Sequence, residues 1–141
     1  MCRLADARFD ADDVMAADEH AVLRLDRYGA THGHLLAVLR DHETRVEALD
    51  WPRYAALQRM AWRALRALAA ALDPVRVSVA ALGAPEALPM SFPHAHVHVV
   101  PLYEGGEAAR PVRVLSWTHG VVVYDDHEAA ALVRRLRDAL G

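Results

Sequence analysis

Three histidines that alternate with small apolar residues are the side chains of this chain best suited to chemistry. His94, His96 and His98 are separated only by Ala95 and Val97. Because the side chains of a β-strand alternate between its two faces, a strand here would carry three imidazoles on one face and apolar side chains on the other. Near neutral pH an imidazole is a nucleophile, a proton carrier and a metal ligand. The row therefore predicts a nucleophilic site or a metal site, with a merely solvated row as the third interpretation.

The overall composition is that of a globular domain. The chain has 141 residues, of which 54% are hydrophobic and 25% charged, and this length favours one domain over residues 1–141. No apolar run approaches the ~20 residues that a membrane helix needs. The acidic start of the chain also lacks the basic and then apolar pattern of a signal peptide. We therefore expect a cytoplasmic protein without a membrane partner.

The charged and sulfur-containing residues exclude several functions. All 16 basic residues are arginine, so a Schiff-base lysine and a Walker-type phosphate loop are absent. The net charge is −3 and the arginines are scattered among acids, which argues against a nucleic-acid polymer as partner. Cys2 is the single cysteine and cannot form an internal disulfide or a thiolate zinc cluster.

Short strands are expected on both sides of one long helix. Apolar or alternating runs bounded by polar and turn residues are typical of strands. The predicted strands cover residues 21–25, 34–40, 76–82, the histidine row, 112–115 and 121–124. The first twenty residues are rich in Ala and Asp and are expected to form a loop or a short helix.

The long helix is predicted to begin after Asp50, which is a suitable N-cap, and to stop at Asp73 before a proline. Its apolar residues fall on one stripe at 3.6 residues per turn. The stripe consists of Tyr54, Leu57, Ala61, Leu65, Leu68 and Leu72. Trp51 and Trp62 lie beside this stripe. They indicate either a partner surface or the edge of the core.

A second helix is predicted near the C-terminus, where Asp125 and Glu128 have the spacing of a capping box. Its inward residues are expected to be Ala129, Leu132, Val133, Leu136 and Leu140. Several strands follow one another without a helix between each pair, which favours an antiparallel sheet. The predicted fold class is therefore α+β, with an antiparallel sheet of about five strands, one long helix between its two halves and a C-terminal helix.

The histidine row resembles the signature of the histidine triad superfamily, in which three alternating histidines are followed by two apolar residues. The resemblance extends upstream to Gly33 and His34, which are similar to the pair that opens a strand in that family, and to His42 eight residues later. It covers roughly residues 21–101. Two weaker matches lie in register with it. Asp26 takes the place of the residue that holds a nucleotide ribose, and Ser91 that of a residue that contacts phosphate.

The resemblance implies a nucleotidyl hydrolase or transferase that attacks the α-phosphorus of a nucleoside derivative. His96 would be the nucleophile and form a covalent phosphoramidate, which water then cleaves. His98 would bind the phosphoryl oxygen and assist the leaving group, while His94 and His34 would orient the row. His42 is interpreted as a supporting hydrogen-bond partner or an exposed residue. No cofactor is implied, and no metal is required for the chemical step.

The expected substrate is a dinucleoside polyphosphate, such as diadenosine tetraphosphate, or a nucleoside phosphoramidate. The resemblance also implies a homodimer whose long helices meet across a twofold axis. His98 stands at the third triad position, where the galactose-1-phosphate uridylyltransferase branch has Gln, and this favours hydrolysis. The remaining histidines are expected at the surface, and Trp117 is expected to be a packing residue.

Two departures from the family pattern keep another function open. Gly83 stands where relatives carry an amide side chain. Pro89 and Met90 replace the Gly-Gln pair that relatives usually carry before the Ser or Thr. These changes indicate altered phosphate recognition and are compatible with a nucleotide-binding protein that has lost catalysis. A zinc ion held by the three histidines, with His34 as a fourth ligand, is a less favoured alternative.

Overall fold

The computed structural model describes residues 11–83 and 93–141. Five strands form one sheet in the order β1-β2-β3-β5-β4, and every neighbouring pair is antiparallel. The strands are β1 (Val14–Ala17), β2 (Ala21–Leu25), β3 (Leu35–Leu39), β4 (Arg76–Ala80) and β5 (His96–Leu102). The helices are α1 (Trp51–Leu72), α2 (Pro111–Val114) and α3 (Asp126–Leu140), with 3₁₀ turns at Ala11–Asp13, Val46–Ala48 and Glu107–Ala109. This is the predicted α+β fold.

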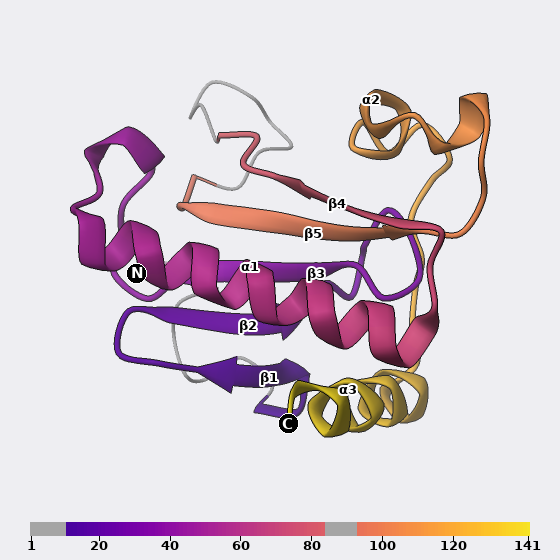
Figure 1. The fold of residues 1–141 in the computed structure, drawn as a ribbon, viewed down its shortest axis with the longest axis horizontal. Coiled ribbons are helices and arrows are strands. Elements are labelled where there is room, and N and C mark those ends of the chain that lie inside the picture. Colours follow the sequence, from indigo (N-terminus) through magenta and orange to yellow (C-terminus); the bar gives the residue numbers. More distant parts are fainter. Residues whose placement is uncertain (1–10, 84–92) are drawn as a thin grey trace.

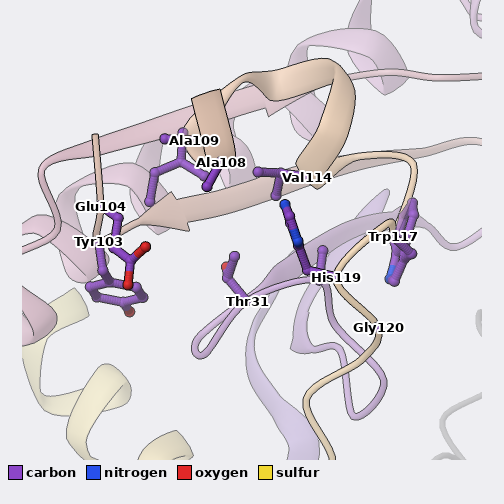
Figure 2. A pocket seen from close by; sticks show the side chains of 11 residues that line it. Thr31, Tyr103, Glu104, Ala108, Ala109, Val114, Trp117, His119 and Gly120 are labelled. Atoms are coloured by element: carbon purple, nitrogen blue, oxygen red, sulfur yellow. The ribbon is translucent and has the colours of Figure 1, made fainter. Parts of the chain in front are cut away.

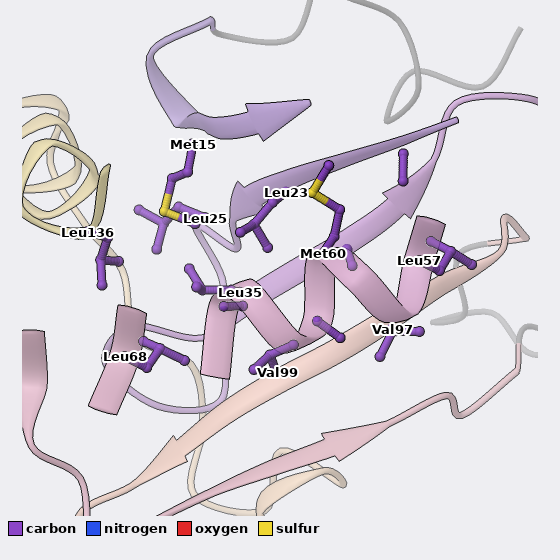
Figure 3. Packing of buried hydrophobic residues seen from close by; sticks show 14 of the residues in the cluster. Met15, Leu23, Leu25, Leu35, Leu57, Met60, Leu68, Val97, Val99 and Leu136 are labelled. Atoms are coloured by element: carbon purple, nitrogen blue, oxygen red, sulfur yellow. The ribbon is translucent and has the colours of Figure 1, made fainter. Parts of the chain in front are cut away.

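The helix α1 crosses one face of the sheet, and α3 packs beside α1 and β1 (Figure 1). The core lies between these helices and the sheet, with Met60 and Leu68 of α1 among the buried side chains (Figure 3). Val97 and Val99 of β5 belong to the same core, as the alternation predicts. The intervening His96 and His98 therefore lie on the sheet face that α1 does not cover.

The bounds of α1 agree with the predicted caps. The Asp50 side chain accepts a hydrogen bond from the Arg53 backbone N–H at 3.1 Å, and Asp73 closes the helix in the left-handed region. The buried face of α1 is centred on small residues. Tyr54 and Leu65 of the predicted stripe are only partly buried. Its buried members are Ala56, Leu57, Met60, Ala61, Ala64, Ala67 and Leu68. Neither α1 nor any other helix in the described part of the chain is long and apolar enough to cross a membrane.

The predicted C-terminal helix is confirmed. Asp125 and Glu128 form both hydrogen bonds of the capping box, at 2.8 and 3.0 Å. Ala129, Leu132, Val133 and Leu136 are buried, and Leu140 packs against the core.

Two predicted strands and one predicted loop are wrong. Residues 112–115 form part of α2 and the turn after it, because Pro111 occupies the first helical position and fixes a helical φ there. Residues 121–124 pair with no strand. Instead, the Val122 backbone N–H donates to Gly29 O at 2.8 Å in the loop after β2. Part of the expected N-terminal loop is the edge strand β1, which four residues form by pairing with β2.

Candidate active site

His96 and His98 lie on β5, a central strand of the sheet. Their ring centroids are 4.7 Å apart, the rings meet edge to face, and their Nε2 atoms are 3.0 Å apart. His98 is 7% exposed, and His96 is partly exposed. His94 precedes the strand and is fully buried, with Nε2 within 2.5 Å of Leu39 O. The structure therefore brings the second and third histidines of the row into direct contact through their reactive nitrogens.

His34 joins this pair from the loop before β3. Its ring is fully buried, and its Nε2 lies 3.0 Å from Nδ1 of His98. The Ala30 backbone N–H donates to its Nδ1 at 2.9 Å. Gly29 packs so closely that a Cβ there would lie 2.5 Å from the Cβ of His34. The loop between β2 and β3 thus fixes His34 through backbone contacts.

The hydrogen bonds assign one tautomer to each ring. The carbonyl of His94 only accepts, so His96 carries its proton on Nδ1 and donates it there at 2.7 Å. His34 accepts at Nδ1 and therefore carries its proton on Nε2, which donates to Nδ1 of His98. His98 then carries its proton on Nε2 and donates it to Nε2 of His96. This series of hydrogen bonds ends at Nε2 of His96, whose lone pair accepts the last of them. His96 is the most exposed ring of the group.

Burial keeps His34, His94 and His98 neutral. The pKa of His34 is lowered to about 4, first by burial and then by the nearby His96. The pKa of His98 is lowered to about 3 by burial, by His96 and by His34. Burial also lowers the pKa of His94, although the hydrogen bond to Leu39 opposes this. Neutral rings agree with the tautomer assignment, because each ring then has one donor and one acceptor.

Asp26 follows β2 and lies beside the histidines. Its Oδ2 is 3.8 Å from Nδ1 of His34, and its Oδ1 accepts from the Tyr28 backbone N–H at 3.0 Å. Burial raises the pKa of this carboxyl group, while the Tyr28 hydrogen bond, Arg24 and His96 lower it. One carboxylate oxygen of Asp26 thus accepts the turn hydrogen bond from Tyr28, and the other lies toward His34.

The other predicted residues are less closely tied to the site. His42 lies beyond the end of β3 and is exposed, and its ring contacts that of His94 at 5.6 Å between centroids. Ser91 and Met90 lie outside the described residues. Gly83 is exposed, with φ +73°, and no atom lies within 4 Å of the position that a Cβ would take there.

Trp117 lies beside the histidine site, a position that was not predicted from the sequence. Its ring centroid lies 5.8 Å from that of His34 and 5.6 Å from that of His98. The sequence indicated packing only, because the contacts join residues that are far apart in the chain and no local pattern marks them. Trp117 also lines a cavity of about 280 Å³ between the end of β5, α2 and the following loop (Figure 2).

Within residues 11–83 and 93–141, no group of three or more His, Cys, Asp or Glu side chains is arranged to hold a metal ion. The ring nitrogens of His34, His96 and His98 that face one another are joined by hydrogen bonds instead. This arrangement suits proton transfer and nucleophilic attack.

Comparison with known proteins gives a consistent result. The family description "HIT domain" matches residues 9–105, which is more than half of the chain. No curated protein sequence matches it.

Three solved structures illustrate the likeness in fold. A HIT-like protein involved in cell-cycle regulation from Bartonella henselae is 15% identical with a TM-score of 0.71, over 90% of this chain and 85% of that one. A hypothetical histidine triad nucleotide-binding protein from Sulfolobus tokodaii is 18% identical with a TM-score of 0.71, over 91% and 83%. A histidine triad protein from Bradyrhizobium japonicum is 21% identical with a TM-score of 0.68, over 96% of both chains. At these identities the likeness shows the fold alone.

Proposed function

We propose that this chain, which belongs to the HIT domain family, is a nucleotidyl hydrolase that attacks the α-phosphorus of a nucleoside derivative through His96. The observation that carries the proposal is the tautomer of His96. Its Nδ1–H is held by His94 O at 2.7 Å, so the lone pair is on Nε2 of this partly exposed residue, where it accepts the Nε2–H of His98 and becomes available to phosphorus when that hydrogen bond breaks. A neutral imidazole held in this way is a competent nucleophile near neutral pH.

In the first step, Nε2 of His96 forms a bond to the α-phosphorus, and the bond to the leaving group breaks with its electron pair. The Nε2–H of His98 turns from His96 to hydrogen-bond the departing group, which takes its proton from solvent, and His34 goes on donating its own Nε2–H to Nδ1 of His98. The His96 ring becomes cationic in the resulting phosphoramidate. The carbonyl of His94 stabilises that cation by accepting the Nδ1–H bond.

In the second step, a water molecule attacks phosphorus and releases a proton to solvent, while His98 keeps its Nε2–H hydrogen-bonded to the phosphoryl group. The phosphorus–nitrogen bond breaks, and His96 regains its lone pair. Both steps use the same pair of rings, and each histidine returns to its starting tautomer.

The substrate is proposed to be a dinucleoside polyphosphate, such as a diadenosine polyphosphate, or a nucleoside phosphoramidate. Asp26 is proposed to accept hydrogen bonds from ribose hydroxyls, and the 3.8 Å between its Oδ2 and Nδ1 of His34 supports a position beside the histidines. Ser91 is proposed to contact phosphate, and His42 to support His94, whose ring it touches.

The test is a panel that includes diadenosine polyphosphates and adenosine phosphoramidate, offered to wild type and His96→Ala. We expect turnover by wild type and a loss of at least about a thousandfold in the variant. His127→Ala is the matched control, because His127 is exposed in the first turn of α3. An unchanged rate in His96→Ala would overturn the proposal.

A catalytically inactive nucleotide-binding protein is the second candidate. It is favoured by Gly83, which presents no side chain for the phosphate chain. Calorimetric binding of AMP or GMP, without product from any nucleotide in the panel, would support this candidate instead.

The proposed assembly is a homodimer. A cytoplasmic location is proposed as well, from the sequence alone. Trp51 and Trp62 on α1 are 73% and 55% exposed, and β4 is an edge strand of the sheet whose Val79 is also exposed. In the described part of the chain no strand pairs with the outer edge of β4, and such an edge together with exposed indoles suits a second copy of the chain.

A further inference from the structure

Trp117 has an unusual backbone conformation. Its φ is +53°, in the left-handed region that bulky side chains rarely adopt. Such a conformation is strained and persists only where the surroundings hold it, often at functional sites. The contacts of Trp117 show what holds it.

The Trp117 indole is fixed from two sides. Its Nε1–H donates to Tyr28 O at 3.2 Å, in the loop that connects Asp26 to His34. Its ring lies against His34 and His98, with interplanar angles of 32° and 71°. The strained residue Trp117 therefore contacts His34 and His98, the two rings that are hydrogen-bonded in series to His96.

Beyond the indole lies the cavity of about 280 Å³, of which Trp117 forms one end and Tyr103 and Glu104 the other (Figure 2). The cavity is open to solvent between α2 and the end of β5. Because Trp117 both lines the cavity and contacts the histidine pair, deletion of its ring would open a path for water from the cavity to His98.

We propose that Trp117 is a positioning residue that excludes water from the His34–His98 pair and so preserves the hydrogen bond in which Nε2–H of His34 is donated to Nδ1 of His98. This inference rests on the proposed function and adds a residue to it. Trp117 does not contact the reacting atoms and acts through His98.

The titratable and charged groups around the His34–His98 pair help to determine whether the pKa of His98 rises or falls when the Trp117 ring is removed. They are His96 on β5, Arg24 on β2, Asp26 after β2, and Glu104 and His119 in the cavity wall. The residue of β4 opposite His98 is Ala80, which does not titrate. Burial is the largest cause of the low pKa of His98. Entry of water therefore raises that pKa toward the ordinary value.

The experiment compares Trp117→Gly, Trp117→Ala and Trp117→Phe with Val112→Ala, an exposed residue of α2. Glycine adopts a positive φ without strain, so Trp117→Gly is the ring deletion that keeps the backbone relaxed. Phenylalanine keeps an aromatic wall but lacks the indole N–H. The ring nitrogens of His98 are titrated by ¹⁵N NMR without substrate, and the pH dependence of kcat and KM is measured with adenosine phosphoramidate.

We expect Trp117→Gly and Trp117→Ala to raise the pKa of His98 by more than about one unit, and Trp117→Phe and Val112→Ala by less than half a unit. At pH 5 the ring deletions should lose up to about thirtyfold in kcat relative to wild type, with little change at pH 8. An unchanged His98 titration in the ring deletions overturns the inference. So does a change in Trp117→Phe as large as that in Trp117→Gly, because it would assign the effect to the indole N–H. If wild type turns over no nucleotide, the proposed function fails, whereas the NMR titration still decides the role of Trp117.

Discussion

Among the histidines of the site, His96 differs from its neighbours in exposure. His34, His94 and His98 are buried, while His96 is partly exposed. The buried rings are tied into fixed hydrogen bonds, and these bonds determine where the lone pair of His96 stands. The reactive atom is thus specified by hydrogen bonds from buried groups of the protein.

The low pKa values of the buried histidines predict loss of stability in acid. Unfolded histidine titrates near pH 6.5, so below that pH the unfolded chain binds protons that native His34 and His98 do not bind. The stability that these neutral rings give the folded state is complete above pH 6.5. It is lost as the pH falls toward the pKa values of the two rings in the folded protein. At pH 5 each ring should cost about 2 kcal/mol of unfolding free energy.

Urea denaturation at pH 7.5 and pH 5 measures this loss. His98→Gln removes one of these titrating rings, so its loss between the two pH values should be about 2 kcal/mol smaller than that of wild type. An equal loss in both proteins would show that His98 titrates normally in the native state.

The close approach of Gly29 to His34 predicts a second effect. In Gly29→Ala the new Cβ would meet the Cβ of His34 at 2.5 Å, so His34 must shift from its place beside His98. We expect a loss of about 1–3 kcal/mol in urea denaturation, together with a large fall in kcat. Gly105→Ala is the control, because no atom lies within 4 Å of its Cβ position. Equal stability of the two variants would contradict this packing of Gly29 against His34.

At the level of elements, the segment 117–124 holds the loop that carries Asp26 and leads into His34. Trp117 donates to Tyr28 O, Val122 to Gly29 O, and Gly33 donates to the Tyr124 hydroxyl at 2.8 Å. A segment without regular secondary structure thus positions the site from outside the sheet.

Tyr124→Phe tests this role. The substitution leaves the Gly33 N–H without its acceptor in a buried position, which should cost about 1–3 kcal/mol in urea denaturation. Hydrogen exchange at Gly33 should accelerate as well. Tyr28→Phe is the control, since the Tyr28 ring is 67% exposed and its hydroxyl change should stay within about 0.5 kcal/mol. Unaltered stability and exchange in Tyr124→Phe would show that the segment does not hold the loop.

The sequence predicted elements best where local chemistry decides them. Asp50 and the Asp125–Glu128 pair marked two helix starts correctly because a cap depends on residues three positions apart. Residues 121–124 alternate like a strand, but no partner strand is available, and the loop at Gly29 takes the hydrogen bond instead. That outcome depends on tertiary contacts, which periodicity does not contain.

The same distinction applies to the site. The spacing of the histidine row predicted that the apolar side chains of β5 enter the core, and Val97 and Val99 do so. Neither the hydrogen-bond chain through His34 nor the contact between Trp117 and His34 follows from spacing, because each joins segments that are far apart in the sequence.

At the scale of the whole molecule, the exposed indoles of α1 lead to a prediction about assembly. We expect light scattering at micromolar concentration to give twice the chain mass for wild type. In Trp62→Asp a charge would be buried at the proposed interface, and that variant should run as a monomer. Val123→Asp is the control, because Val123 is exposed in the segment after α2. A monomeric wild type would contradict the proposed dimer.

The central claim is that His96 bonds to phosphorus during turnover, and the stereochemical outcome at phosphorus tests it most directly. A P-chiral adenosine phosphorothioate substrate is hydrolysed in ¹⁸O-labelled water, and the configuration of the product is determined. Two successive displacements, first by His96 and then by water, predict net retention. Net inversion would show a single direct attack by water and would contradict the account.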